Sequence, residues 1–272
     1  MRLAPLAAGV AALVLAAPAA HADLPFDLRP ILVGEIDLRV HSAPALEGKD
    51  GFAVHRLRLG ARASFTPWFS AAAQVELVGE SSRILDASVT VKPTPEWEVT
   101  FGAGKTPLFS SARYEPVWSL PVPGLSMTTR AFWAGYDAGL KVHRLPTPHL
   151  PIEGCLRVGN GSGNALGNDN SSYALDAAFG RAVAGASARE RFGLRFDVGV
   201  HVESAEGRLD ISDTTADDFL FYRPPTVSGP RHVVDGHLVA HAGQVKLTVE
   251  GALAKEGRSK VTNGNPHTPR VA

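Results

Sequence analysis

The sequence has almost no cysteine and no net charge, and these two shortages exclude several classes of protein. Its 272 residues include one cysteine, Cys155, and its 27 lysines and arginines are balanced by 27 aspartates and glutamates. A single cysteine can form neither an internal disulfide framework nor a cysteine metal cluster. A chain without an overall basic field also gives no indication that nucleic acid is its partner.

Long apolar runs are also scarce, with one exception near the N-terminus. Residues 6–20 form an apolar stretch behind a short positive start, and Ala20-His21-Ala22 fits a small-x-small cleavage site. This pattern is typical of a secretory signal peptide, here predicted over residues 1–22 with the mature chain beginning at Asp23. An N-terminal anchor helix is the alternative. No later stretch reaches the ~18 apolar residues of a spanning helix, so a place within a membrane would require strands.

Alternation of apolar and polar residues is the strongest pattern that the chain does contain. Between Phe52 and Trp68, leucine, alanine and phenylalanine share one parity, whereas Arg56, Arg58 and Arg62 share the other. Successive side chains of a strand point to opposite faces, so this segment would have one apolar face and one face lined by guanidinium groups. Similar alternation recurs in about eleven segments and predicts an all-β protein. These segments are 31–40, 52–65, 69–78, 84–92, 96–104, 134–143, 152–158, 173–181, 192–202, 233–242 and 244–254.

The connections between these segments alternate between short and long. The short ones are rich in proline, which we expect to lie in the turns because it cannot donate a hydrogen bond to a strand ladder. Short periplasmic turns and long outer loops are typical of an antiparallel transmembrane β-barrel. A soluble secreted β-sandwich with its apolar faces inside is an alternative. The short connections are 66–67, 93–95 and 145–151, and the long ones are 41–51, 105–133, 160–172 and 204–231.

The odd number of strands leaves two interpretations open. Bacterial single-chain barrels have an even number of strands, so a weak twelfth strand near residues 208–212 is one possibility. The other is that residues 23–272 form a barrel domain truncated at its C-terminal end, because residues 263–269 are expected to form a loop and no closing apolar strand follows them.

Four short stretches carry a resemblance to a known family. They are residues 56–62 (RLRLGAR), residues 85–87 (LDA), residues 101–109 (FGAGKTPLF) and residues 155–161 (CLRVGNG). They resemble the phosphate-selective porin O and P family of Gram-negative outer membranes. The resemblance implies a trimeric barrel of about sixteen strands in contact with outer-membrane lipid. It also implies a long loop folded into the lumen after the fifth strand, here residues 105–133.

The resemblance further implies a porin for passive diffusion of small hydrophilic solutes, with a preference for anions such as phosphate. Acidic residues share the predicted lumen, so a weakly selective pore is an alternative. The arginines of the wall would then pair with Glu76 and Asp86 and stiffen it. A non-conducting structural or adhesive barrel is a further alternative. The expected pore-lining residues are Arg56, Arg58, Arg62, Glu76, Asp86, Lys105, Arg113, Arg130 and Lys141.

No pattern in the sequence indicates catalysis, a metal site or a cofactor. Serine and histidine are scattered without the spacing of a nucleophile and its base. His237 and His241 share a parity, but four residues of strand separate them by roughly 13 Å, too far to share one ion. Lys105-Thr106 lacks the glycine of a phosphate-binding loop, because Val99 occupies that position. We therefore expect a protein that is not an enzyme.

Overall fold

The described part of the chain folds into a single antiparallel sheet of thirteen strands, in which each strand pairs with its neighbours in sequence. The computed structural model describes residues 11–13, 26–39, 51–78, 82–109, 129, 132–133, 135–161, 167–168, 171–184, 192–209, 226–243, 245–262 and 265–267. The all-β prediction is confirmed, and each of β2 to β12 overlaps one of the segments expected from alternation, with β10, β11 and β12 longer than expected. The strands are β1 (Ala11–Leu13), β2 (Asp27–Arg39), β3 (Gly51–Thr66), β4 (Phe69–Glu76), β5 (Arg83–Thr94), β6 (Trp97–Lys105), β7 (Tyr136–Arg144), β8 (Ile152–Gly159), β9 (Ala174–Ala184), β10 (Phe192–Leu209), β11 (Thr226–Ala242), β12 (Val245–Thr262) and β13 (Asn265–His267).

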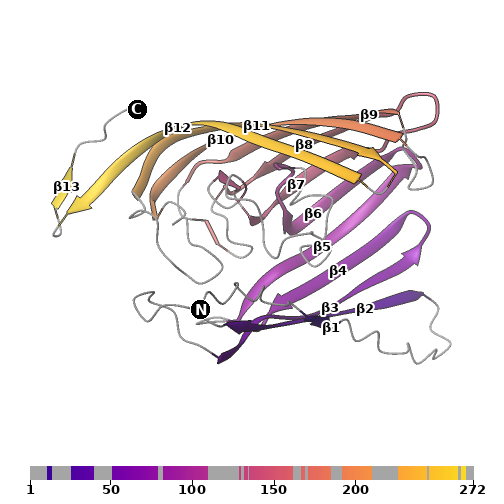
Figure 1. Ribbon diagram of the computed structural model, residues 1–272, viewed down its shortest axis with the longest axis horizontal. Coiled ribbons are helices and arrows are strands. Elements are labelled where there is room, and N and C mark those ends of the chain that lie inside the picture. The colour runs from indigo at the N-terminus through magenta and orange to yellow at the C-terminus, as the bar shows by residue number, and fades with distance from the viewer. Residues whose placement is uncertain are drawn as a thin grey trace, which may run out of the picture.

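The sheet is strongly curved. Strands β2 to β4 lie opposite β10 to β12, with β5 and β6 connecting the two sides (Figure 1). Among the described residues, the strand order is linear, and β1 and β13 form its two ends. We call the concave face, on which Arg157 lies, the inner face and the convex face the outer face.

The boundaries of β10 and β11 correct one expectation from the sequence. Residues 204–231 were expected to form a long loop, but β10 continues to Leu209 and β11 begins at Thr226. The pairing of these strands shifts register between Ala205 and Arg208. This shift interrupts the alternation and hides the strand from sequence analysis. Arg208 and Leu209 therefore end β10 rather than begin a twelfth strand, and residues 210–212 lie outside the described residues.

Two further expectations need correction. Prolines were expected only in turns, but Pro30, Pro93 and Pro230 lie within β2, β5 and β11, at exposed positions. Residues 263–269 were expected to form a loop, but Asn265–His267 form β13, paired with Lys260–Thr262 of β12. Strand β1 falls within the predicted signal peptide and pairs with β2. Removal of residues 1–22 stays a prediction.

The two faces of the sheet have opposite characters. Along β11, Arg231, Val233, Asp235 and His237 are buried on the inner face, and the residues between them are exposed. The exposed outer positions carry large apolar side chains, including Phe101 (66% exposed) and Leu253 (79% exposed). A sheet in water normally buries its apolar face and exposes its polar face. This sheet does the reverse. Other large apolar outer residues are Leu59, Leu156, Leu175, Phe179, Val198, Val200, Val234, Leu238, Leu247 and Val249.

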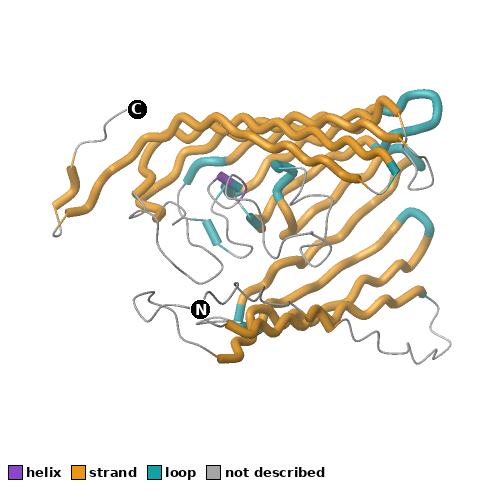
Figure 2. Tube along the Cα trace, in the orientation of Figure 1, coloured by secondary structure: helices purple, strands orange, loops and turns teal. Residues whose placement is uncertain are grey.

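A small apolar cluster lies on the inner face. Leu108 and Phe109, which follow β6, are fully buried against Val233 of β11. Phe132, Trp133 and Ala252 pack around them, and a helical turn is closed by a hydrogen bond from Trp133 N to Thr129 O. Figure 2 places the helical and loop pieces of this segment on the concave side of the sheet. Its described ends lie on this inner side, and residues 110–128, 130–131 and 134 lie outside the described residues. A loop folded into a lumen stays a prediction.

Candidate functional site on the charged inner face

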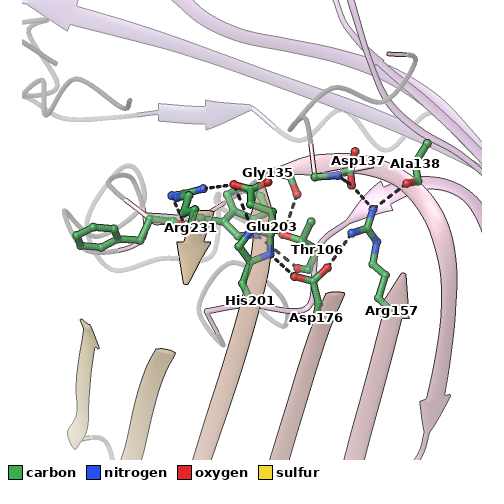
Figure 3. A network of polar contacts seen from close by, with 12 residues as sticks. Thr106, Gly135, Asp137, Ala138, Arg157, Asp176, His201, Glu203 and Arg231 are labelled. Carbon is green, nitrogen blue, oxygen red and sulfur yellow. Dashed lines mark hydrogen bonds and ion pairs between the residues drawn. The ribbon is translucent and has the colours of Figure 1, made fainter. Parts of the chain in front are cut away.

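The centre of the candidate site is Arg157 on β8, which lies between two carboxylates of the neighbouring strands. Its Nη2 is 2.6 Å from Oδ2 of Asp137 on β7, and its Nη1 is 2.8 Å from Oδ2 of Asp176 on β9 (Figure 3). All three side chains are almost fully buried. The guanidinium group lies flat over Gly159, where an added Cβ would come within 2.3 Å of Nη2. Arg157 therefore neutralises two buried carboxylates while its guanidinium group packs against the sheet.

The chain of contacts continues across the next three strands. Asp176 Oδ1 is 2.6 Å from Nδ1 of the fully buried His201 on β10, whose Nε2 is 3.2 Å from Oε1 of Glu203. Arg231 on β11 then contacts Glu203 at 3.0 Å and Glu256 of β12 at 2.8 Å. These polar contacts connect six strands, as Figure 3 shows for most of their length. We call this set the buried band: Asp137, Arg157, Asp176, His201, Glu203, Arg231 and Glu256.

The buried band also contacts the segment between β6 and β7. Arg231 Nη2 donates a hydrogen bond to the carbonyl oxygen of Phe132 at 3.1 Å. Nearby, the Thr129 hydroxyl donates to Oε1 of Glu250 on β12. At the start of the segment, the Thr106 hydroxyl donates to the carbonyl oxygen of Gly135 at 3.2 Å. Polar contacts and the apolar cluster therefore hold the described ends of this segment against β11 and β12.

A second set of charges runs across the inner face, and its basic members are only partly buried. Lys92 of β5 contacts Glu98 of β6 at 2.6 Å, and His143 of β7 contacts Glu98 at 3.4 Å and Glu153 of β8 at 2.7 Å. Arg195 of β10 contacts both Glu153 and Asp197 at 2.7 Å. We call this set the half-buried band: Lys92, Glu98, His143, Glu153, Arg195 and Asp197.

Glycine makes one contact of the half-buried band possible. Arg195 lies on β10 and Glu153 on β8, so their ion pair spans β9. The residue of β9 that lies opposite both Glu153 and Asp197 is Gly180. A Cβ at Gly180 would lie 2.1 Å from Oδ1 of Asp197 and 2.6 Å from Nη2 of Arg195. The missing side chain thus gives the guanidinium group room to cross the strand.

The structure brings together two of the three arginines predicted to line the wall. Arg56 Nη1 is 2.8 Å from Oε2 of Glu35, and Arg58 Nε contacts the predicted Glu76. The Glu76 carboxylate also accepts a hydrogen bond from the Leu57 backbone N–H at 2.9 Å. Arg62 is separate from this group and lies exposed near the turn between β3 and β4. The alternative in which these arginines pair with Glu76 therefore describes Arg56 and Arg58.

Among the other predicted pore-lining residues, Lys105 lies within range of the charges of Arg56, Arg58 and Asp86. Asp86 on β5 accepts a hydrogen bond from the Ser88 hydroxyl at 2.6 Å. Lys105 ends β6 opposite Tyr136, and Lys141 of β7 lies opposite Thr100, both half-buried. Arg113 and Arg130 lie outside the described residues.

The buried band was missed by the sequence analysis although each member lies on the polar parity of its strand. Alternation indicates that Arg157, Asp176 and Arg231 share a face, but only strand register brings them side by side. The connections on either side of β9 differ in length, so the sequence leaves this register undetermined. The signal in the sequence that would have indicated the buried band is the presence of opposite charges on the polar parity of neighbouring strands.

Other kinds of site find little support in the described part of the chain. No group of three or more His, Cys, Asp or Glu side chains is placed there to hold a metal ion. Within the same residues, the structure has no helix with the length and apolar character needed to cross a membrane. No family model and no curated protein matches the chain. The geometry of the two faces therefore carries the functional argument.

Proposed function

We propose that this chain is an outer-membrane porin that allows passive diffusion of small hydrophilic solutes. In this proposal the sheet closes into a barrel, with its outer face in lipid and its inner face around an aqueous lumen. The observation that carries the proposal is the reversed character of the two faces along β2 to β12. No cofactor or energy source is involved.

The outer face exposes many large apolar side chains. Contiguous exposed apolar surface of this extent is unusual on a soluble monomer and marks a surface that contacts another apolar phase. A lipid bilayer covers such a face without a second protein layer, provided that backbone groups are paired between strands. A soluble sandwich would instead turn Leu156, Val198 and Leu238 inward, whereas these side chains are exposed here.

The resemblance to the phosphate-selective porin O and P family supplies the finer parts of the proposal. By that resemblance the barrel would have more strands than β2 to β12 and would form trimers in the outer membrane. The predicted signal peptide agrees with export from the cytoplasm. The inward course of Thr106–Phe109, Thr129 and Trp133 supports a lumen narrowed by this segment.

A non-conducting structural or adhesive barrel is the second candidate. The observation that favours it is the apolar cluster of Leu108, Phe109 and Val233, which fills part of the inner side of the sheet. A barrel whose inner side is filled throughout would anchor in the membrane without passing ions. Conductance separates the two candidates, because both predict the same location.

The first experiment expresses the complete precursor in a Gram-negative host and separates its membranes. We expect the protein in the detergent-extracted outer membrane and stepwise conductance after its addition to a planar lipid bilayer. A protein that is located in the membrane but gives no conductance would favour the non-conducting barrel. Recovery in the soluble periplasmic fraction would contradict both and favour the soluble sandwich.

A second experiment tests the outer face directly. Leu238→Arg on β11 places a charge where we propose lipid, and it should lower the free energy of unfolding by about 2–4 kcal/mol if the position is near the middle of the bilayer. Leu150→Arg is the matched control, because Leu150 has similar exposure but lies in the connection between β7 and β8. Urea titration of both variants in lipid vesicles measures the difference. Equal stability of the two variants would contradict a lipid-facing β11.

A further inference from the structure

We infer that the pore favours neutral and cationic solutes over anions, because carboxylates neutralise the arginines of its wall. This inference rests on the proposed porin function and identifies the class of solute for the same site. It departs from the anion preference that the family resemblance implies. Its basis is the set of ion pairs on the inner face.

Five arginines of the inner face have carboxylate partners at ion-pair distance. Arg157 and Arg231 each contact two carboxylates, and their side chains are only 3% and 5% exposed. Arg56 and Arg58 contact Glu35 and Glu76, and Arg195 contacts Glu153 and Asp197. A guanidinium group held by a carboxylate acts at a distance as a small dipole, so it exerts little attraction on a passing anion.

The balance of buried charge also disfavours anions. The buried charged residues of the described chain comprise eight carboxylates against two arginines and two histidines. The arginines in contact with these carboxylates therefore complete the neutralisation of an acidic wall. The eight are Glu35, Asp137, Glu153, Asp176, Asp197, Glu203, Asp235 and Glu256.

Selectivity in a wide pore follows the net fixed charge near the permeation path. An anion-selective wall needs cationic groups that water and solute can reach and that lack a bound counter-charge. Arg62 is exposed, but it lies near the turn between β3 and β4, at the end of the wall. Arg56 and Arg58, farther along the same strand, are paired. Lys105 and Lys141 are half-buried cations of the same wall. The buried charges of the described wall nevertheless have more carboxylates than arginines.

The experiment measures reversal potential in asymmetric potassium chloride across a planar bilayer. For the unmodified protein we expect a potassium-to-chloride permeability ratio above one. A ratio of one or below would overturn the inference and leave the porin proposal intact. Absence of any channel would instead contradict the proposed function, so the two failures are distinguishable.

A second measurement tests the inference more directly by removing one neutralising carboxylate. Glu76→Gln leaves Arg58 without its counter-charge but keeps a carbonyl oxygen that can accept the Leu57 N–H. We expect the potassium-to-chloride ratio to fall by roughly twofold, because the net charge near the path becomes more positive. The matched control is Glu96→Gln, which removes one exposed carboxylate in the turn between β5 and β6. It should leave the ratio unchanged.

Folding of each variant is checked by heat-modifiable migration in detergent gels before conductance is measured. If Glu76→Gln does not fold, Glu98→Gln replaces it, because Glu98 neutralises Lys92 in the half-buried band. The same fall in the ratio is expected. A folded, conducting variant of either kind with an unchanged ratio would show that these carboxylates do not set selectivity, and would overturn the inference.

Discussion

The two sides of the curved sheet bury their inner faces to different degrees. On the C-terminal side, β8 alternates strictly, with Glu153, Cys155, Arg157 and Gly159 buried and its outer residues half-buried or exposed. On the N-terminal side, every residue of β4 is half-buried or exposed, and β5 has a single buried residue, Leu85. The same alternating pattern of sequence thus gives two environments.

The difference follows from where the segment between β6 and β7 lies. Its described ends contact β11 and β12, where Leu108 and Phe109 meet Val233. Charges on the C-terminal side are therefore enclosed and stabilise the wall. On the N-terminal side Glu35 is buried as well, but Lys92 and Arg62 remain within reach of water. In the proposed pore, charges of the inner face would consequently have two separable roles, one structural and one in the electric field that solutes meet.

Of the changes that test this difference between the two sides, replacement of Arg157 should lower the free energy of unfolding the most. Arg157→Met removes the guanidinium group that Asp137 and Asp176 share in the buried band, so the free energy of unfolding should fall by about 3–5 kcal/mol. Arg62→Met, on the exposed part of the N-terminal side, should change it by less than about 0.5 kcal/mol. Urea titration of the folded protein in detergent or lipid measures both. Similar losses for the two variants would remove the distinction between the sides.

Truncation of Leu108 should have a somewhat smaller effect. Leu108→Ala opens a cavity in the apolar cluster and should lower the free energy of unfolding by about 2–4 kcal/mol. It should also increase the reactivity of a thiol introduced at Val233, measured with a water-soluble maleimide in a Cys155→Ala background. Leu156→Ala on the outer face is the matched control and should leave this thiol protected. Protection in both variants would indicate that Leu108 does not cover Val233.

An added methyl group at Gly180 should have the smallest effect of the three. Gly180→Ala forces Asp197 and Arg195 to move and weakens the contact of Arg195 with Glu153, at a cost of about 1 kcal/mol. Gly236→Ala on β11 is the control, because a Cβ there has no atom within 4 Å. The difference in urea midpoint between the two variants checks this. Equal midpoints would mean that Arg195 finds an equivalent position without the glycine.

Much of the strand content could be predicted from the sequence, because alternation is strong wherever pairing is regular. All eleven predicted segments became strands. The predicted bounds of β10 and β11 were wrong, because local sequence preferences compete there with strand pairing. The register shift after Ala205 breaks the alternation of β10, and Gly229-Pro230 at the start of β11 suggests a turn. Pairing with the neighbouring strand outweighs these local preferences.

The candidate site was less predictable than the strands. Sequence analysis assigned Arg56, Arg58 and Glu76 to one face because parity fixes the face of each residue. It did not find the buried band, because parity does not determine strand register, that is, which residues of neighbouring strands lie opposite one another. Arg157 meets Asp137 and Asp176 only through the observed register of β7, β8 and β9. Long-range packing, such as that of Leu108 on Val233, leaves no local pattern in sequence.

The order of the strands has a consequence for how the chain reaches this structure. Each strand pairs with the next in sequence, so the sheet can grow by successive pairing of strands that are adjacent along the chain. The segment between β6 and β7 is different, because Thr129 contacts Glu250 across 121 residues of sequence. Its binding surface does not exist until β11 and β12 have formed. We therefore expect docking of this segment to be a late step in folding, after assembly of the strands on which it rests.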